Sequence, residues 1–313
     1  MRFHPTHPLC GCAGNPKDRR RKEVSITKLQ LTYELACEFC SALGYPVETG
    51  QDAVGILCLE GAEPLPELEG LIDLNPNAPD FYNDCVVLYW RDSQGQHLRA
   101  LQATTEPGRY YTRIRPHPKG AANLVWGHHL YKRGKHRGHP ALVSASGLDR
   151  VWRDRDADFS QDITERVYQG RFGIHVHAGG RGRSIGRWSA GCIAIHGGYE
   201  GEPYRFFLER IERHPGRLFN LTLWGVRDLR RWVQDKSGWR PTLRYGIKNP
   251  WVARVQKFLN HHMDARLVAD GDWGPKTQEV FCEFQGKTGL VVDGICGPLS
   301  WGKLENNESE VHK

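Results

Sequence analysis

The sequence predicts a multidomain α+β protein, with a β-rich domain in the middle of the chain and a small three-helix module near the C-terminus. Between about residues 85 and 225 the apolar runs are short and are separated by Gly, Pro and Asp, which is typical of strands joined by turns. Near the C-terminus, residues 270–277 (DGDWGPKT) return 23 positions later as residues 293–300 (DGICGPLS). A length of 313 residues allows two or three such domains.

The N-terminal part is expected to support the central domain. Residues 1–23 are polar and basic and predict a flexible arm; no apolar segment follows their Lys and Arg run, so we expect no secretory leader. Residues 24–66 predict an amphipathic helix behind Ser25 as N-cap, then a strand, both packing on the central domain. Cys37 and Cys40 fall on the apolar face of this helix and are expected in the core rather than on zinc.

Residues 67–235 are expected to form the β-rich central domain. Segment 60–80 contains four prolines and predicts a connecting loop. Residues 236–248 predict a linker, and residues 305–313 a disordered tail. The expected strands are residues 54–59, 85–90, 98–104, 141–144, 173–177, 192–196 and 218–224, with a helix at residues 204–213.

Residues 249–304 contain the repeated turn, and each copy predicts a helix start. Its glycines supply backbone angles that other residues resist, and its proline fits the first helical turn. The segment resembles the peptidoglycan-binding module with the pattern VxxxQxxLN, DGxxGxxT, FQxxxGL, DGxxGxxTW. The resemblance implies noncatalytic binding to peptidoglycan, and the residues expected at the ligand are Asp270, Trp273, Asp293 and Trp301.

The central domain carries a candidate thiol nucleophile. Cys192 ends the sequence Ser189-Ala190-Gly191-Cys192 and follows His175-Val176-His177 by 15 residues. A reactive thiol needs an imidazole within reach, and the two histidines lie on one face of a strand, so either can serve. A small residue before the cysteine lets backbone N–H groups approach an oxyanion.

Together these residues resemble the catalytic signature of the L,D-transpeptidase family, over roughly residues 70–200. The resemblance implies that Cys192 attacks the third residue of a stem tetrapeptide and expels D-alanine. An amine acceptor then gives a 3→3 cross-link, and water gives L,D-carboxypeptidase activity. Motif matching implies roles for Ser189 and for Gly191 at the oxyanion, and favours His177 over His175 as the base. Arg187 and Trp188, just before the motif, are the expected substrate contacts of this domain.

Two departures from the motif keep other functions open. The commoner motif has a histidine where Ala190 stands and an arginine where Ala194 stands, and both changes bear on how substrate carboxylates are held. The alternatives are a phage lysin or secreted effector that hydrolyses murein peptides, and a catalytically inactive wall-binding protein. The expectation that the chain has no leader favours the lysin or effector, and Ala190 and Ala194 favour the inactive wall-binding protein.

Partners and cofactors follow from weaker signals. A net charge of +7 favours acidic partners, and nine cysteines in a leaderless chain predict free thiols. Residues 154–165 space their acids like a calcium loop, with Asp154, Asp156, Asp158, Asp162 and Glu165 at the ligand positions, but Phe159 stands where such loops have Gly. A solvated acidic turn is the favoured interpretation, and calcium binding by this loop stays open. We therefore expect peptidoglycan as the partner, at the cell wall or periplasm, with no metal, cofactor, nucleic acid or membrane span. The sequence leaves the oligomeric state and the export route open.

Overall fold

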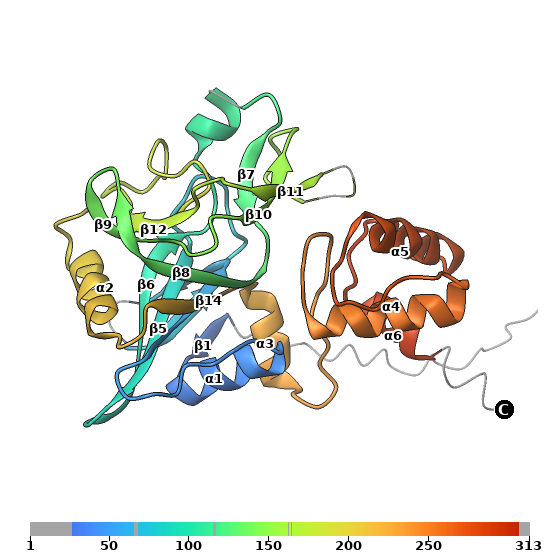
Figure 1. Ribbon diagram of the computed structural model, residues 1–313, viewed down its shortest axis with the longest axis horizontal. Helices are drawn as coiled ribbons and strands as arrows, with labels where there is room; N and C mark the ends of the chain where they lie inside the picture. The colour runs from blue at the N-terminus through green and yellow to red at the C-terminus, as the bar shows by residue number, and fades with distance from the viewer. Residues whose placement is uncertain (1–26, 66–67, 115–116, 162, 164, 307–313) are drawn as a thin grey trace, which may run out of the picture.

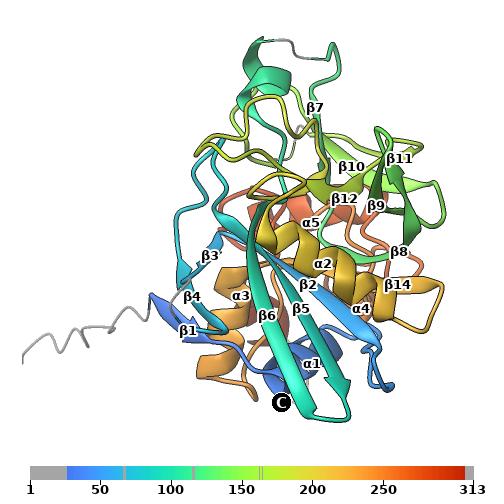
Figure 2. The same ribbon diagram turned by 90° about the vertical axis from the view of Figure 1, so that its left-hand side faces the viewer.

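A closed sheet of eight strands forms the centre of the computed structural model, which describes residues 27–65, 68–114, 117–161, 163 and 165–306 (Figure 1). The strand order around the sheet is β12-β13-β6-β5-β2-β14-β8-β9. Its members are β2 (Val54–Glu60), β5 (Asp84–Asp92), β6 (Gly95–Thr104), β8 (Gly127–His136), β9 (His139–Ser144), β12 (His175–Ala178), β13 (Ile193–Ile195) and β14 (Leu218–Gly225). Figure 2 shows the long β5–β6 hairpin from the front.

Alternation along the strands separates two apolar cores. In β2, Val54, Ile56 and Cys58 join the cluster inside the closed sheet. Leu57 and Leu59 point outward and join a second cluster, which continues into the helices. Because successive side chains of a strand face opposite ways, a strand buried on both faces must be apolar throughout.

The outer core is covered by helices and by the start of the chain. The helices are α1 (Tyr33–Ala42) and α3 (Val226–Gln234), with α2 (Glu202–Arg213) elsewhere on the sheet. A small sheet, β1 (Lys28–Gln30), β4 (Leu71–Leu74) and β3 (Ala62–Pro64), lies beside them. A second small sheet has the order β11 (Val167–Gly170), β10 (Asp149–Asp154), β7 (Ala121–Leu124), and the π-helix η1 (Tyr110–Ile114) precedes it.

The sequence predicted seven of the eight strands of the closed sheet, but neither β8 nor the two small sheets. All seven expected strands are present within a few residues, as is helix α2. The expected loop at residues 60–80 is wrong, because β3 and β4 pair within it. The first helix begins at Tyr33, and Thr32, not Ser25, caps it by accepting the N–H of Leu35 at 3.2 Å.

The cysteine predictions hold for the described residues. Cys40 is fully buried and Cys37 is half-buried on α1, which fits core packing. All seven described cysteines are free thiols. Cys10 and Cys12, the remaining two, lie outside the described residues.

The C-terminal module contains the three predicted helices, α4 (Pro250–Met263), α5 (Pro275–Lys287) and α6 (Pro298–Asn306). Each repeated turn is held by a glutamine from the preceding helix. Gln256 accepts the N–H of Gly271 at 2.9 Å, and Gln285 accepts the N–H of Gly294 at 2.8 Å. The sequence repeat is therefore a repeat of one turn and its glutamine clamp.

The module packs directly on the rest of the protein (Figure 1). Asn249 donates to the carbonyl of Leu43 at 2.6 Å, and the Trp251 indole donates to that of Ala42 at 2.9 Å. The Arg150 guanidinium of β10 donates to both carboxylate oxygens of Asp272, at 2.9 and 2.6 Å. Such bidentate pairs fix orientation as well as distance.

Residues 236–248 are not a free linker. Leu243 and Ile247 are fully buried in the outer core, and Leu243 forms a bridge with Cys296. The expected tail begins inside α6, which runs to Asn306, and residues 307–313 lie outside the described part of the chain, as does the arm at 1–23. No helix of the described ranges is long and apolar enough to cross a bilayer.

Candidate active site

Cys192 lies just before β13, where the backbone of residues 173–175 reaches its sulfur. The N–H of His175 lies 3.5 Å from Sγ, and the thiol donates to the carbonyl of Gly173 at 3.6 Å. The Asp149 carboxylate accepts the N–H of Ile174 at 3.2 Å and so fixes the segment between them. Cys192 keeps 9% of its surface exposed.

The turn before the thiol depends on Gly191. This residue has a φ of 128°, and a Cβ on it would lie 2.1 Å from the carbonyl oxygen of Ala122 in β7. Its N–H donates to Ser189 Oγ at 3.0 Å, and that hydroxyl donates to the carbonyl of Cys192 at 2.7 Å. In this state the Gly191 N–H is bound to Ser189, so its expected role at an oxyanion stays a prediction. Gly191 provides close packing, and Ser189 holds the turn.

His177 presents an imidazole to this thiol from β12. Its Nδ1–H donates to the carbonyl of Ala178 at 2.8 Å, which leaves Nε2 as the unprotonated nitrogen. Nε2 is buried and has no hydrogen-bond partner among the described residues. A ring nitrogen of His177 lies within 4.8 Å of the Cys192 sulfur.

A second imidazole, His136, completes the group from the tip of the β8–β9 hairpin. Its ring stacks on His177 at 4.1 Å with an interplanar angle of 4°. Its Nδ1 lies 2.9 Å from Nδ1 of His175, so the His175 ring is engaged with His136. The sequence motif around Cys192 does not include His136, which lies 56 residues earlier in the chain. The pairing of β9 with β12 brings it to the site.

Burial keeps the resting pair uncharged. Desolvation lowers the pKa of His177 to about 4, and the neighbouring His136 acts in the same direction. Burial likewise raises the pKa of the Cys192 thiol, although the His175 N–H opposes this. At neutral pH the site therefore holds a thiol and a neutral imidazole, so any thiolate forms as the proton moves to His177.

Two groups in the described part of the chain have ligand atoms close enough for a metal, and His136, His177 and Cys192 form one of them. Its geometry suits a metal poorly. The lone pairs of the two stacked rings lie in parallel planes, so both could not point at one shared ion unless the rings rotated. Asp154, Asp156 and Glu165 form the second group. Asp154 and Glu165 are each 2% exposed, so the interpretation of this segment as a solvated turn is wrong for them.

The loop leading to Cys192 carries the expected substrate contacts. Arg187 and Trp188 are both exposed, and the Arg187 guanidinium stacks on Tyr110 of η1 at 4.3 Å. Ala190 is exposed, whereas Ala194 is fully buried against Tyr82 and Ile185. An arginine at position 194 would have to displace this packing.

A basic pocket of about 240 Å³ lies on the neighbouring small sheet. Its lining residues are Lys119, Arg153, Arg155, Arg166 and Tyr168. Arg153 links it to the thiol site, since its guanidinium stacks on Phe172 at 5.1 Å and Phe172 precedes the thiol's acceptor, Gly173. Alternation along β10 points Asp154 to the opposite face, so no carboxylate is among the lining residues.

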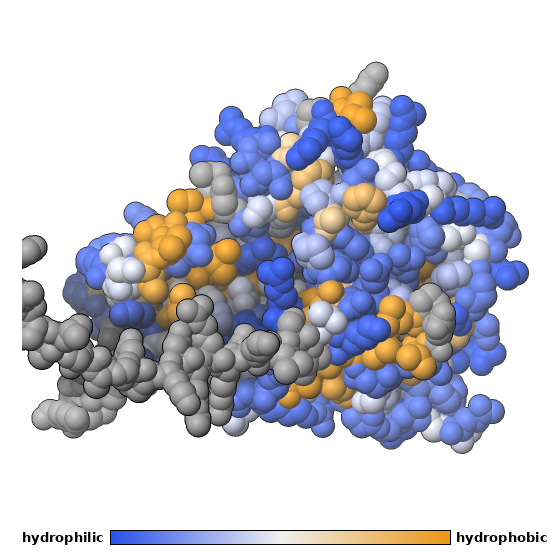
Figure 3. Space-filling view, turned by 180° about the vertical axis from the view of Figure 1, so that it is seen from behind, coloured by the Kyte–Doolittle hydropathy of each residue, from blue (hydrophilic) through white to orange (hydrophobic). Residues whose placement is uncertain are grey.

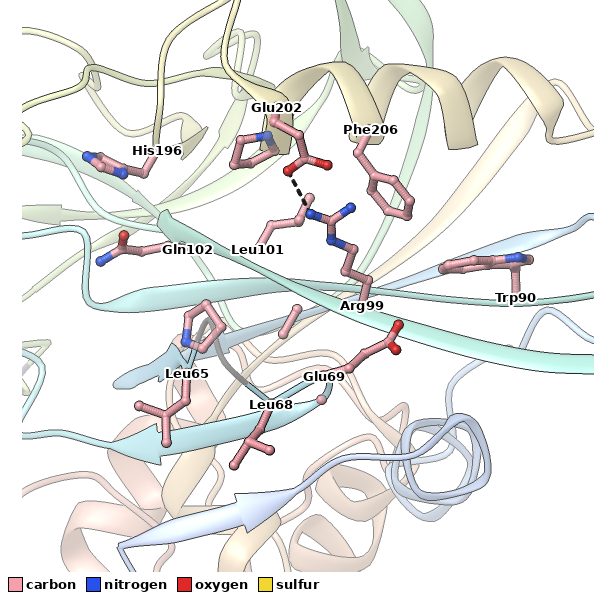
Figure 4. A pocket seen from close by; sticks show the side chains of 14 residues that line it. Leu65, Leu68, Glu69, Trp90, Arg99, Leu101, Gln102, His196, Glu202 and Phe206 are labelled. Carbon is pink, nitrogen blue, oxygen red and sulfur yellow. Dashed lines mark hydrogen bonds and ion pairs between the residues drawn. The ribbon is translucent and has the colours of Figure 1, made fainter.

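A larger pocket of about 560 Å³ lies elsewhere, between β6, α2 and the β3–β4 segment (Figure 4). Its charged side chains Arg99 and Glu202 form an ion pair at 2.6 Å. It contains no nucleophile and none of the residues around Cys192. Its size therefore does not make it the candidate site.

The two tryptophans that the sequence placed at the module's ligand are buried, whereas Asp270 and Asp293 are exposed. Trp273 and Trp301 are 0% and 2% exposed, so their rings cannot stack on a glycan, and their assignment as ligand contacts is wrong. The Asp270 and Asp293 carboxylates accept hydrogen bonds from Gln256 and Gln285 within the two turns. The module instead exposes four large apolar side chains: Val268, Val291, Val292 and Leu299. Figure 3 shows the surface coloured by hydropathy.

Comparison with known proteins identifies the module. Residues 248–304 match the family model described as "Putative peptidoglycan binding domain". An uncharacterized protein in the bpoA1 3'region of Kitasatospora aureofaciens is 51% identical over 41 residues, which cover 13% of this chain and 35% of that protein. The chain thus matches about a third of that relative's length. No solved structure matches the present chain. The comparisons identify residues 248–304 as a peptidoglycan-binding domain.

Proposed function

We propose that this protein is a cysteine enzyme of the L,D-transpeptidase type that acts on peptidoglycan stem peptides. The observation that carries the proposal is the buried His177 imidazole in a protein with a peptidoglycan-binding domain. A ring nitrogen of His177 lies within 4.8 Å of the Cys192 sulfur, and its Nε2 has no hydrogen-bond partner among the described residues. The module packs against the central domain through Asp272 and Arg150, so wall binding would hold the thiol near its substrate.

In the first half-reaction, Cys192 attacks the carbonyl carbon of the third stem residue. The thiol proton passes to Nε2 of His177 as the S–C bond forms. The carbonyl oxygen becomes an oxyanion, and we assign its stabilisation to the backbone N–H of Cys192. The imidazolium then gives its proton to the amine of D-alanine, the C–N bond breaks, and a thioester remains.

In the second half-reaction an acceptor attacks the thioester. His177 takes a proton from the incoming amine or water, the new bond forms at the carbonyl carbon, and the thiolate leaves and regains that proton. An amine gives a 3→3 cross-link, whereas water gives a tripeptide. A neutral imidazole suits both halves, because it must accept a proton before it can donate one.

The basic pocket supplies cations in place of the arginine that the commoner motif has where Ala194 stands. Stem peptides carry free carboxylates, and Arg and Lys side chains bind such groups strongly. Since Arg153 connects this pocket to the segment at the thiol, we assign it to a substrate carboxylate.

Muropeptide mass spectrometry tests the enzyme proposal. Wild-type protein incubated with purified muropeptides is expected to release terminal D-alanine or to form 3→3 dimers, and Cys192→Ala is expected to do neither. The ratio of tripeptide to dimer separates hydrolysis from transpeptidation. If wild type changes no muropeptide but still sediments with sacculi, the chain is a wall-binding protein instead.

The carboxylate assignment predicts a change in substrate affinity. Arg166→Gln removes one exposed cation of the pocket and should raise KM about 5- to 20-fold with little change in kcat, as expected for loss of one charged hydrogen bond. Arg205→Gln, an exposed charge on α2, is the matched control. With substrates whose carboxyls are amidated, Arg166→Gln and wild type should have the same KM. An equal effect on acid and amide substrates would refute the assignment.

A further inference from the structure

The connection between β10 and β11 gathers carboxylates on the face of the small sheet opposite the basic pocket. One oxygen from each of Asp154, Asp156 and Glu165 lies within 4.8 Å of the other two. Buried carboxylates are costly unless they are paired with cations or bind a metal. Yet no ion pair in the described ranges involves Asp154 or Asp156.

Asp154 provides a separate observation that points to a ligand. It is 2% exposed, and its Oδ2 accepts the N–H of Phe159 at 3.2 Å. Its buried Oδ1 has no hydrogen-bond partner within the described residues. Burial, together with the nearby Asp158 and Asp156, raises the pKa of this carboxyl, as expected where charge lacks compensation.

The backbone angle of Phe159 answers the objection that this position lacks the glycine of a calcium loop. Calcium loops of twelve residues place ligands at positions 1, 3, 5 and 12 and need a left-handed residue at position 6. Asp154, Asp156, Asp158 and Glu165 occupy those ligand positions. Phe159 occupies position 6 with a φ of 66°, and so adopts the conformation that glycine usually provides. Asp162, at position 9, lies outside the described residues, and the site is built without it.

We propose that Asp154, Asp156 and Glu165 bind one calcium ion, with Asp158 beside them. The donors are all oxygens, which hard cations prefer. Oxygens on opposite sides of calcium lie about 4.6–5.2 Å apart, against about 4.0–4.2 Å for magnesium. The observed spacing within 4.8 Å accommodates calcium.

The site has a structural consequence for the basic pocket. Arg153 and Arg155 flank Asp154 in the chain, and Arg166 follows Glu165. An ion that joins Asp154 to Glu165 therefore fixes both strands from which the pocket's arginines extend. The calcium proposal itself does not depend on the enzymatic one, because binding is measured without turnover.

Calorimetric titration of the full-length, chelator-treated protein with calcium chloride tests the site. We expect one ion per chain, with a Kd on the order of 10⁻⁵–10⁻³ M, a higher Tm with calcium, and weaker binding of magnesium. Asp156→Asn, at an exposed position, should weaken binding at least about tenfold, and Glu165→Gln should do the same. Asp264→Asn, an exposed acid at the end of α4, should not.

Three results would overturn the proposal. One is the absence of both heat and a Tm shift in wild type at roughly 5 mM calcium, above the weakest range of such loops. Another is unchanged affinity in both Asp156→Asn and Glu165→Gln. The third is magnesium binding as tight as calcium binding. Each can occur whether or not the protein processes muropeptides, so failure here is distinct from failure of the proposed function.

Discussion

Replacing His177 by Ala is expected to lower kcat on muropeptides about 10²- to 10⁴-fold, the usual contribution of a general base. The reason is that burial raises the pKa of the Cys192 thiol, so the thiol needs an acceptor for its proton. His177 has a ring nitrogen within 4.8 Å of the sulfur and an Nε2 without a hydrogen-bond partner among the described residues. Initial rates of D-alanine release measure the effect. His175→Ala should lose less, because its ring faces His136 and its backbone N–H still reaches the sulfur.

The same variant should change how stability depends on pH. The folded-state pKa of His177 is about 4, below the ordinary value of 6.5, because burial disfavours the charged ring. Between pH 6.5 and 4 the unfolded chain therefore takes up a proton that the folded state excludes, and wild type loses stability as pH falls. His177→Ala removes this loss, worth up to about 3 kcal/mol.

His261→Ala, at an exposed position on α4, serves as the control for both measurements. It should keep wild-type turnover and the wild-type loss of stability in acid. Full activity of His177→Ala together with an inactive His175→Ala would reassign the base. Identical acid sensitivity of His177→Ala and wild type would show that His177 is not held neutral by burial.

Gly191→Ala is expected to lower the free energy of unfolding by about 2–4 kcal/mol, from an unfavourable backbone angle and a backbone clash together. Its φ is 128°, and the new Cβ would lie 2.1 Å from the Ala122 carbonyl oxygen. β7 or the thiol turn must then move, so turnover should also fall by at least about tenfold. Urea unfolding and muropeptide rates measure the two effects.

Gly182→Ala is the matched control, because it lies in the same loop, has no positive φ and has open space around its Cβ. It should leave stability and activity within error of wild type. Equal behaviour of the two variants would mean that the turn tolerates a side chain, and that the close packing of β7 on Gly191 is not required.

Local sequence patterns were enough to predict the repeated turns, most strands and the thiol motif, because these depend mainly on residues close together in the chain. The repeated DG-x-x-GP turns predicted the C-terminal module, since glycine and proline restrict the backbone wherever they occur. Short apolar runs predicted seven of the eight strands of the closed sheet, but not the polar β8. The sequence Ser189-Ala190-Gly191-Cys192 after His177 predicted a thiol and an imidazole, which β12 and β13 bring together as parallel neighbours.

Other features needed contacts between distant segments. His136 reaches His177 only because β9 pairs with β12, and the basic pocket exists only because β10 pairs with β11. Strand partners of this kind are set by closure of the whole sheet, and no local periodicity encodes them.

The remaining wrong predictions concerned residues that proved to be buried. Trp273 and Trp301 looked like ligand contacts in the sequence, yet packing with Phe281 and with the Pro241 segment places them in the core. Segment 236–248 looked like a linker, yet Leu243 and Ile247 fill the space between the domains. The sequence by itself determined the turns, the strands and the reactive residue types. Only the tertiary structure decided which side chains are buried and which histidine faces the thiol, because both depend on packing between segments far apart in the chain.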